Sequence, residues 1–390
     1  MPHRESFLKP LFVKKLDLVI LFVTSICNAK CRTCFYWLEL NHKGDLTLEE
    51  LTKLSSTMPE FADLWISGGE PFLRKELAKI IELFYANNHI RDVRIPTNGL
   101  PTNQTLETVT EILHKCPKLH LEVDVSIDGF GETHDRIRGV HGNFKKALTT
   151  IRELQTLRPK WPNFTLYVNS VITQENQNEI VDLAQFFEGK SQLDGHYFQI
   201  IRGEPKDPKL QGVEPSRLKQ IYEQVLPINV NYLSRVARIK SWSQALTKAY
   251  WRSGYEFSYQ TQYRNYSERA KWKMPCTAGQ TSIVIDYNGD VRVCELRKPI
   301  GNLRRHGMDF QRFWNSGERR LEVNQVGVDK CFCTHICFMY DSMRHSKRVM
   351  LWELPLISLK RTLMGFLAER NTAIPPERVE SRILAAQHEQ

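Results

Sequence analysis

Residues 25–37 read SICNAKCRTCFYW, and they directly follow an apolar, β-rich run over residues 16–24. Cys27, Cys31 and Cys34 place three thiols on this short loop, with three and then two residues between them. Thiolates hold iron–sulfur cubes, and complete protein ligation of a cube takes four cysteines. Three cysteines leave one iron without a protein ligand, as catalytic metal sites leave a position open for chemistry. The loop therefore predicts an enzyme whose metal site lies just past a strand.

Strand-like and helix-like segments alternate after this loop, which predicts an α/β fold built from parallel βαβ units. We expect strands at 16–24, 63–67, 93–97, 119–127, 164–172 and 196–201, and helices at 47–58, 73–88, 102–115, 144–157 and 176–188. Thr47 and Glu50 have the spacing of a capping box at the first helix. The unusual sequences lie just past the strand ends, so a partial (β/α)6 TIM-type barrel is favoured over a doubly wound sheet.

Length and composition bound the class of protein. The chain has 390 residues, enough for about two domains. No apolar run of about 18 residues and no signal-peptide cleavage site is evident, so we expect a cytoplasmic protein without a membrane-spanning helix. Eight of the nine cysteines fall in two groups, which indicates metal ligation in a reducing compartment. The remaining cysteine, Cys116, is expected to be a buried structural thiol.

Glycine-rich and polar sequences follow three of the expected strands. They are Gly68-Gly69-Glu70-Pro71, Thr97-Asn98-Gly99 and Ser126-Ile127-Asp128-Gly129. Glycine lets a backbone approach a ligand closely, and barrel enzymes build their sites at this end of the strands. Each sequence alone also fits a plain turn, so the order in which they follow the cysteine loop carries the signal.

In that order, these sequences resemble the radical S-adenosylmethionine (SAM) enzymes over roughly residues 16–345. The resemblance implies that Cys27, Cys31 and Cys34 hold a [4Fe–4S] cluster whose open iron binds SAM. An electron from a donor such as flavodoxin or ferredoxin then yields a 5′-deoxyadenosyl radical that abstracts hydrogen from substrate. The SAM contacts implied are Gly68, Gly69, Glu70, Asn98, Ser126, Asp128 and Arg138. Arg138 is the candidate for the SAM carboxylate, because a guanidinium fork suits that group.

Two structural alternatives stand beside this interpretation. The cysteine loop is alternatively a zinc site, although no nearby fourth ligand completes one. The run from His134 to Gly139, which contains Arg138, is alternatively a turn and helix cap.

A second cysteine group begins at Cys276 and has the pattern Cys276, twelve residues, Gly289, four residues, Cys294. Residues 283–293 between these cysteines predict a β-hairpin with an Asn-Gly turn. Further along, residues 330–337 contain Cys331, Cys333 and Cys337. The group resembles the auxiliary-cluster extension called SPASM, or its shortened form called twitch.

The SPASM resemblance implies a small α+β domain with auxiliary iron–sulfur ligation. A full SPASM pattern has seven or more cysteines, and the five here indicate one auxiliary [4Fe–4S] cluster. Cys276, Cys294 and Cys337 are the surer ligands, and either Cys331 or Cys333 is the fourth. A zinc knuckle that uses His335 is the alternative.

The chain is expected to divide into an N-terminal extension (1–15), a barrel (16–205), a linker with a helical, aromatic segment (206–275), the auxiliary-cluster domain (276–345) and a basic C-terminal segment (346–390). The aromatic residues of 250–272 either cover the barrel mouth or pack against it. Residues 344–361 interleave basic residues with Trp and Leu, as interfacial segments do. Peripheral contact with membrane or lipid and ordinary packing are both open, and Pro355 is expected to break or kink a helix there.

Charge and aromatic content also admit partners of other classes. The net charge is +10, and residues 296–370 hold 14 Lys and Arg against 7 Asp and Glu. This basic stretch is either a solvated surface or one that attracts phosphates, nucleic acid or anionic lipid. A non-catalytic metal-binding or RNA-binding module is therefore the rival class. The ordered strand-end sequences argue against it, so no nucleic-acid partner is expected.

The expected function is radical chemistry on a small molecule such as a sugar, nucleotide or lipid precursor, in a redox or rearrangement step of a biosynthetic pathway. The reduced cysteine count favours a small molecule, because peptide-modifying relatives usually carry the full set. A peptide- or protein-modifying maturase is the alternative.

Overall fold

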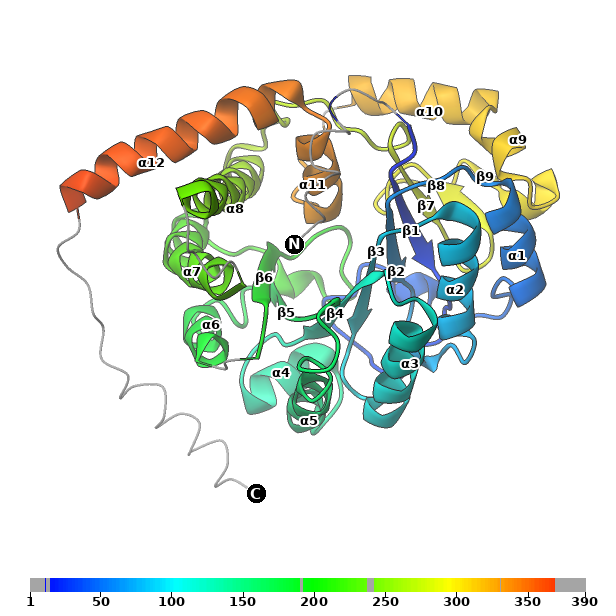
Figure 1. The fold of residues 1–390 in the computed structure, drawn as a ribbon, viewed down its shortest axis with the longest axis horizontal. Coiled ribbons are helices and arrows are strands. Elements are labelled where there is room, and N and C mark those ends of the chain that lie inside the picture. Colours follow the sequence, from blue (N-terminus) through cyan, green and yellow to red (C-terminus); the bar gives the residue numbers. More distant parts are fainter. Residues whose placement is uncertain (1–10, 12–14, 190–191, 237–241, 330, 369–390) are drawn as a thin grey trace.

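The computed structural model describes residues 11, 15–189, 192–236, 242–329 and 331–368. Of the expected N-terminal extension only Leu11 and Lys15 are among them, and residues 369–390 of the expected C-terminal segment also lie outside the described residues. Figure 1 shows a curved sheet whose outer side is covered by helices. The expected α/β architecture is confirmed.

Six parallel strands form the barrel part of the sheet, in the order β6-β5-β4-β3-β2-β1. The strands are β1 (Leu18–Phe22), β2 (Asp63–Ser67), β3 (Asp92–Thr97), β4 (His120–Ser126), β5 (Phe164–Ile172) and β6 (Gly195–Ile200). The helices between them are α1 (Leu48–Thr57), α2 (Leu77–Asn88), α3 (Thr102–Lys115), α4 (Gly131–Arg138), α5 (Asn143–Gln155) and α6 (Ile180–Glu188). All six expected strands are present, so the partial (β/α)6 barrel is confirmed.

Local sequence explains how these helices begin. Thr47 caps α1 by accepting a hydrogen bond from the backbone of Glu50, whose side chain accepts one from the backbone of Thr47, as a capping box requires. α4 was not predicted as a helix, because its sequence is strongly polar, and a turn and helix cap was the structural alternative for residues 134–139. Gly139 ends it in the left-handed conformation at φ +67°.

The hairpin of the second cysteine group extends the barrel sheet. β7 (Ser282–Ile285) pairs in parallel with β1, and β8 (Asp290–Arg292) and β9 (Gly301–Asn302) follow antiparallel. The predicted hairpin is confirmed, with Gly289 at φ +85° in its turn. The sequence did not predict that β7 joins β1. The auxiliary region and the barrel therefore share one sheet of nine strands.

Two long helices, α7 (Pro215–Val236) and α8 (Trp242–Glu268), follow β6. Both helices lie in the expected linker with its helical, aromatic segment, and the aromatic residues of 250–272 belong largely to α8. Its Tyr259 is buried and stacks on Tyr222 of α7 with ring centroids 4.5 Å apart. The aromatic segment was expected either to cover the barrel mouth or to pack against the barrel. Packing accounts for Tyr222 and Tyr259.

The remaining helices are α9 (Phe310–Trp314), α10 (Gly317–Val328), α11 (Ile336–Arg344) and α12 (Leu354–Ala368). Arg344 at the end of α11 makes ion pairs with Asp17, at 2.8 Å, and with Asp63, which fasten α11 to the starts of β1 and β2. Pro355 does not break the helix. A π-helical turn, Val349–Glu353, leads directly into α12, where Pro355 is the second residue.

The described helices and Cys116 bear on two further expectations from the sequence. None of the helices among the described residues is both long and apolar enough to pass through a bilayer. Cys116 is buried at the end of α3, as expected.

A buried histidine on β6 makes the fold sensitive to acid. His196 is almost completely buried, with its Nε2 atom 2.7 Å from the hydroxyl of Ser170 and no partner for Nδ1. Burial lowers the pKa of His196 from 6.5 to about 3. Its contribution to stability is therefore present above pH 6.5 and is lost as the pH falls toward 3, because only the unfolded imidazole takes up a proton there.

We expect His196 to lower the free energy of unfolding of the apoprotein by about 2 kcal/mol between pH 7 and pH 5. Urea unfolding at both pH values measures this loss. The His196→Asn variant should lose less over the same window, whereas His141→Asn, which alters a fully exposed imidazole, should behave as wild type. Equal losses in all three proteins would contradict the assignment of a neutral buried imidazole.

Candidate radical SAM site

The cysteine loop after β1 is held against the end of α4. The backbone N–H of Lys30 donates to the carbonyl of Arg138 at 3.2 Å, and that of Arg32 donates to Ile137 at 2.8 Å. The N–H of Cys27 donates to the Oδ1 atom of Asn41 at 3.0 Å. These bonds fix a loop that has no regular secondary structure of its own.

The three thiols suit an iron–sulfur cube better than zinc. All three are free and partly buried, and burial raises the pKa of Cys27 to about 12 and that of Cys34 to about 11. Tetrahedral zinc would place its sulfur ligands about 3.8 Å apart. Among the described residues, only two groups of three potential ligands have their atoms within 4.8 Å of one another, and neither includes the triplet. At least one pair of these sulfurs therefore lies farther apart than 4.8 Å, as sulfurs bound to separate irons of a cube can.

A cavity lies beside this loop at the carboxyl ends of the strands. Its lining brings together residues that lie far apart in the sequence. The sequence-predicted site residues in the lining are Cys27, Cys31, Cys34, Gly68, Gly69, Glu70, Asn98, Ser126 and Arg138. These side chains and turns come from β1, β2, β3, β4 and α4, so the barrel topology alone assembles them.

The Gly68-Gly69 turn runs along the start of the cysteine loop. The N–H of Gly69 donates to the carbonyl of Thr24, and that of Glu70 donates to Ile26, both at 2.8 Å. A Cβ atom on Gly69 would lie 2.1 Å from the oxygen of Ile26. Gly68 has φ +141°, a conformation that favours glycine. Glycine is therefore required here for two backbones to touch.

Glu70 anchors the neighbouring strand end. Its carboxylate accepts hydrogen bonds from the hydroxyl of Thr97, at 2.9 Å, and the backbone of Asn98, at 2.8 Å. Burial raises the pKa of Glu70 to about 7. The Nδ2 atom of Asn98 in turn donates to Asn28 in the cysteine loop at 2.8 Å. Glu70 and Asn98 thus tie three segments of the site together.

Arg138 faces the cysteine loop, and Asp128 holds it there. The Nε atom of Arg138 lies 2.7 Å from an Asp128 oxygen, and its Nη1 atom lies 3.9 Å from the sulfur of Cys31. Asp128 itself is completely buried and accepts a hydrogen bond from the backbone of Val171 at 2.8 Å. Arg138 therefore borders the cavity, while Asp128 lies behind it and orients it.

Several cavity residues were not predicted from the sequence. Asn169 on β5, Gln199 on β6 and Arg202 just after β6 line the same cavity. Arg202 stacks on Phe35 of the cysteine loop, with its guanidinium carbon 4.8 Å from the ring centre. These three residues lie toward or just past the carboxyl ends of β5 and β6, the last two strands of the barrel. That position in the sequence is the signal that could have identified them.

The second cysteine group lies between the hairpin and the start of α11. Burial, and then the thiols of Cys276 and Cys331, raise the pKa of Cys333 to about 12. Burial and then Cys333 raise the pKa of Cys294 well above its ordinary value. For Cys337 the largest cause after burial is the carboxylate of Glu295, and its pKa rises to about 12. Glu295 therefore lies close to Cys337.

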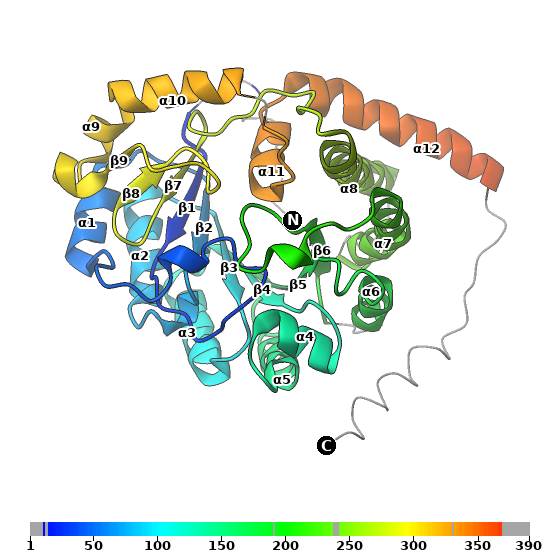
Figure 2. The same ribbon diagram turned by 180° about the vertical axis from the view of Figure 1, so that it is seen from behind.

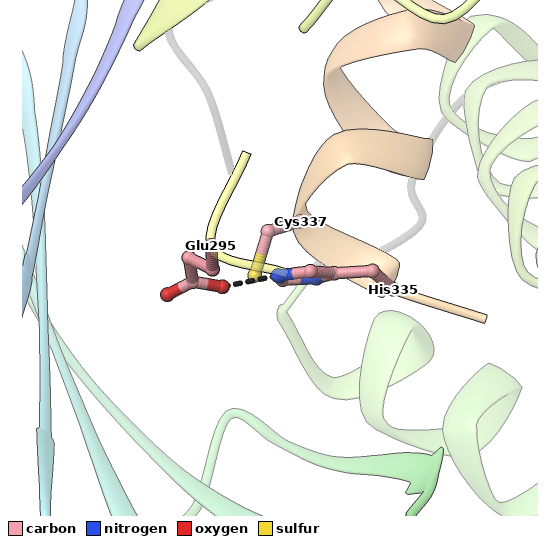
Figure 3. Close-up of side chains that lie close together, drawn as sticks. All are labelled: Glu295, His335 and Cys337. Carbon is pink, nitrogen blue, oxygen red and sulfur yellow. Dashed lines mark hydrogen bonds and ion pairs between the residues drawn. The ribbon is translucent and has the colours of Figure 1, made fainter. Parts of the chain in front are cut away.

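Figure 3 shows Cys337 beside Glu295 and His335, whose side chains contact each other. The three potential ligand atoms lie within 4.8 Å of one another. A metal-bound imidazole ordinarily donates its second N–H to a partner, but among the described residues the Nδ1 atom of His335 has no hydrogen-bond partner. The Nη2 atom of Arg202 also lies 3.6 Å from Glu295. A guanidinium at that position disfavours a cation, so the arrangement fits a buried polar cluster better than the zinc knuckle.

Comparisons with known proteins agree with this geometry. The radical SAM superfamily model matches residues 21–187, and the model of an iron–sulfur cluster-binding domain, SPASM, matches residues 276–335. The structure of native anSMEcpe with bound AdoMet covers 89% of this chain and 100% of its own, with a TM-score of 0.55 at 16% identity. That similarity concerns the fold. The chain belongs to the radical SAM superfamily and is an enzyme of that class with a SPASM domain.

Two curated relatives of this chain have names that state different kinds of activity. Sporulation killing factor maturation protein SkfB of Bacillus subtilis is 27% identical over 165 residues, which are 42% of this chain and 37% of SkfB. The probable GTP 3′,8-cyclase of Methanococcus vannielii is 30% identical over 210 residues, which are 52% of this chain and 64% of the relative. The chain thus spans less than two thirds of the length of each.

The two domains define the cofactors. The first implies a [4Fe–4S] cluster and SAM, which supply the chemistry of reductive SAM cleavage, and the SPASM domain implies auxiliary iron–sulfur ligation. Such an enzyme also needs a substrate and a reductant.

Proposed function

We propose that Cys27, Cys31 and Cys34 hold the cluster with one iron open, and that SAM binds in the adjoining cavity. The observation that carries this proposal is the shared lining, which places all three cysteines beside the Gly68-Gly69 turn and Arg138. Arg138 is the proposed partner of the SAM carboxylate, because Asp128 orients its guanidinium beside the cysteine loop. Glu70, Asn98 and Ser126 complete the SAM contacts.

The second cysteine group holds one auxiliary [4Fe–4S] cluster in this proposal. The proposed ligands are Cys276, Cys294, Cys331 and Cys333. The thiol of Cys331 raises the pKa of Cys276, that of Cys333 raises the pKa of Cys294, and those of Cys276 and Cys331 raise the pKa of Cys333, which supports their proximity. The matched SPASM region, residues 276–335, contains all four cysteines but not Cys337. Cys337, which the sequence pattern ranked among the surer ligands, is instead assigned to the cluster with Glu295 and His335.

Iron content after anaerobic reconstitution tests this ligand set. Wild-type protein should carry about eight irons per chain, and the variant that combines Cys294→Ala with Cys333→Ala about four, because the two cysteines that remain do not hold a cube. Cys337→Ala should keep about eight. A Cys337→Ala protein that carries half the wild-type iron, beside a Cys331→Ala protein that carries all of it, would contradict the assignment.

The proposed reaction is abstraction of a hydrogen atom from a small molecule, such as a sugar, nucleotide or lipid precursor, after reductive SAM cleavage. The reduced number of cysteines in the second group supports this class. The similarity to SkfB, named as a maturation protein, keeps a peptide or protein substrate as the second candidate. A flavodoxin or ferredoxin is the proposed electron donor.

Stimulation of 5′-deoxyadenosine formation distinguishes the two substrate classes. A cell extract from the source organism is passed through an ultrafilter, and the low-mass filtrate is assayed before and after protease treatment. A small-molecule substrate should stimulate SAM cleavage from the filtrate in a protease-resistant manner. Stimulation that appears only in the retained fraction, or that protease abolishes, would favour a maturase.

A further inference from the structure

The C-terminal helix carries an apolar face that no described residue covers. Leu351, Trp352, Leu356 and Leu359 are 47%, 68%, 57% and 57% exposed. They are four of the eleven large hydrophobic residues that the described part of the chain exposes, and they fall within nine consecutive positions. Trp352, Leu356 and Leu359 have i, i+4, i+7 spacing, which places them along one side of a helix. We call these four residues the C-terminal face.

The opposite side of the same segment already packs against the protein. Met350 and Leu354 are buried, and the hydroxyl of Tyr250 on α8 donates to the carbonyl of Met350 at 3.0 Å. Arg361 pairs with Glu256 of α8 at 2.9 Å. Figures 1 and 2 show α12 at the edge of the molecule, in contact with α8. Tertiary packing thus fixes the orientation of the C-terminal face, and the segment that carries this face is not a fraying helix end.

Basic residues border the C-terminal face. Residues 347–361 contain four basic residues, Lys347, Arg348, Lys360 and Arg361, against the single acidic residue Glu353. Lys347, Arg348 and Lys360 are exposed, and Arg348 pairs with Glu353 at 3.1 Å. An exposed Trp and Leu stripe with Lys and Arg at its margins is the pattern of helices that lie in the interface of an anionic bilayer.

We propose that the C-terminal face docks this enzyme on the surface of an anionic lipid bilayer, with the helix lying parallel to it. The charge of the segment argues for this occupant over a second copy of the chain, since a symmetric pairing would bring like basic margins together. None of the described helices is long and apolar enough to cross a bilayer, and the contact proposed here lies in the interface. The proposal is independent of the substrate proposed above.

Co-sedimentation of the full-length, reconstituted enzyme with lipid vesicles tests this proposal. Wild type should sediment with phosphatidylcholine–phosphatidylglycerol vesicles, less with phosphatidylcholine alone, and less at high salt. Trp352→Ala combined with Leu356→Ala should weaken binding to the mixed vesicles by roughly tenfold or more. The matched control is Leu321→Ala on α10, where the side chain is 73% exposed but lies outside the face. This control should bind as wild type.

Three outcomes would overturn the proposal. If the wild-type protein stays in the supernatant with mixed vesicles at low salt, it does not dock on an anionic bilayer. A double variant that sediments like wild type shows that the face is not responsible. A double variant that turns a dimer into a monomer in size-exclusion chromatography, without change in vesicle binding, identifies the face as a contact between copies. SAM cleavage should be unaffected in the double variant, so failure here leaves the proposed reaction untouched.

Discussion

The Cys31→Ala variant is expected to form no 5′-deoxyadenosine above background when it is reduced in the presence of SAM. Cys31 lies between the other two cysteines of the loop, and its sulfur is the one that faces Arg138, at 3.9 Å from Nη1. Its removal leaves two protein ligands for a cube that ordinarily takes more. Loss of the cluster then abolishes reductive cleavage.

Cys116→Ala is the matched control, because it removes a buried thiol at the end of α3 that does not line the cavity. It should retain iron and SAM cleavage. Chromatography of 5′-deoxyadenosine, together with iron analysis, reads out both variants. Cleavage by Cys31→Ala at the wild-type rate would show that the first cluster is held elsewhere.

The Gly69→Ala variant is expected to lose both iron binding and stability. The added Cβ atom would lie 2.1 Å from the Ile26 oxygen and 2.7 Å from the Ser25 oxygen, and backbone atoms cannot rotate away as side chains do. The turn and the cysteine loop must separate to admit it. Overpacking of this kind costs about 3 kcal/mol in unfolding free energy.

Gly254→Ala on α8 serves as the control, because a Cβ atom there meets no other atom within 4 Å. Alanine in a helix should stabilise that variant by about 0.5–1 kcal/mol. Urea unfolding of the apoproteins and iron content after reconstitution measure the two effects. A Gly69→Ala protein with wild-type stability and iron content would show that the close contact of the turn and the loop is dispensable.

Much of the barrel could be predicted because its determinants are local. β2, α3 and β5 begin and end at the predicted residues. The capping box at Thr47 and the turn at Gly289 were also legible, since each depends on residues a few positions apart. The triplet spacing and the strand-end glycines identified the family for the same reason.

The rest depends on contacts that no local pattern encodes. The pairing of β7 with β1 joins residues more than 250 positions apart, so the second cysteine group was read as a separate small domain. The spacing of Cys337 predicts a ligand, and no local pattern shows that its thiol also lies beside Glu295 and His335. The resemblance implies Asp128 as a SAM contact, and no local pattern shows that it is completely buried and paired with Arg138, which does line the cavity.

Electron paramagnetic resonance of the reduced protein tests the central claim, an iron left open for SAM beside the cysteine loop. The variant that combines Cys294→Ala with Cys333→Ala is the sample of choice, because only two of the proposed auxiliary ligands remain and the signal of the first cluster is left alone. The account predicts a reduced cubane signal that changes shape when SAM is added, in this variant and in wild type. A cubane signal that SAM leaves unchanged, or the absence of any cubane signal, would contradict it.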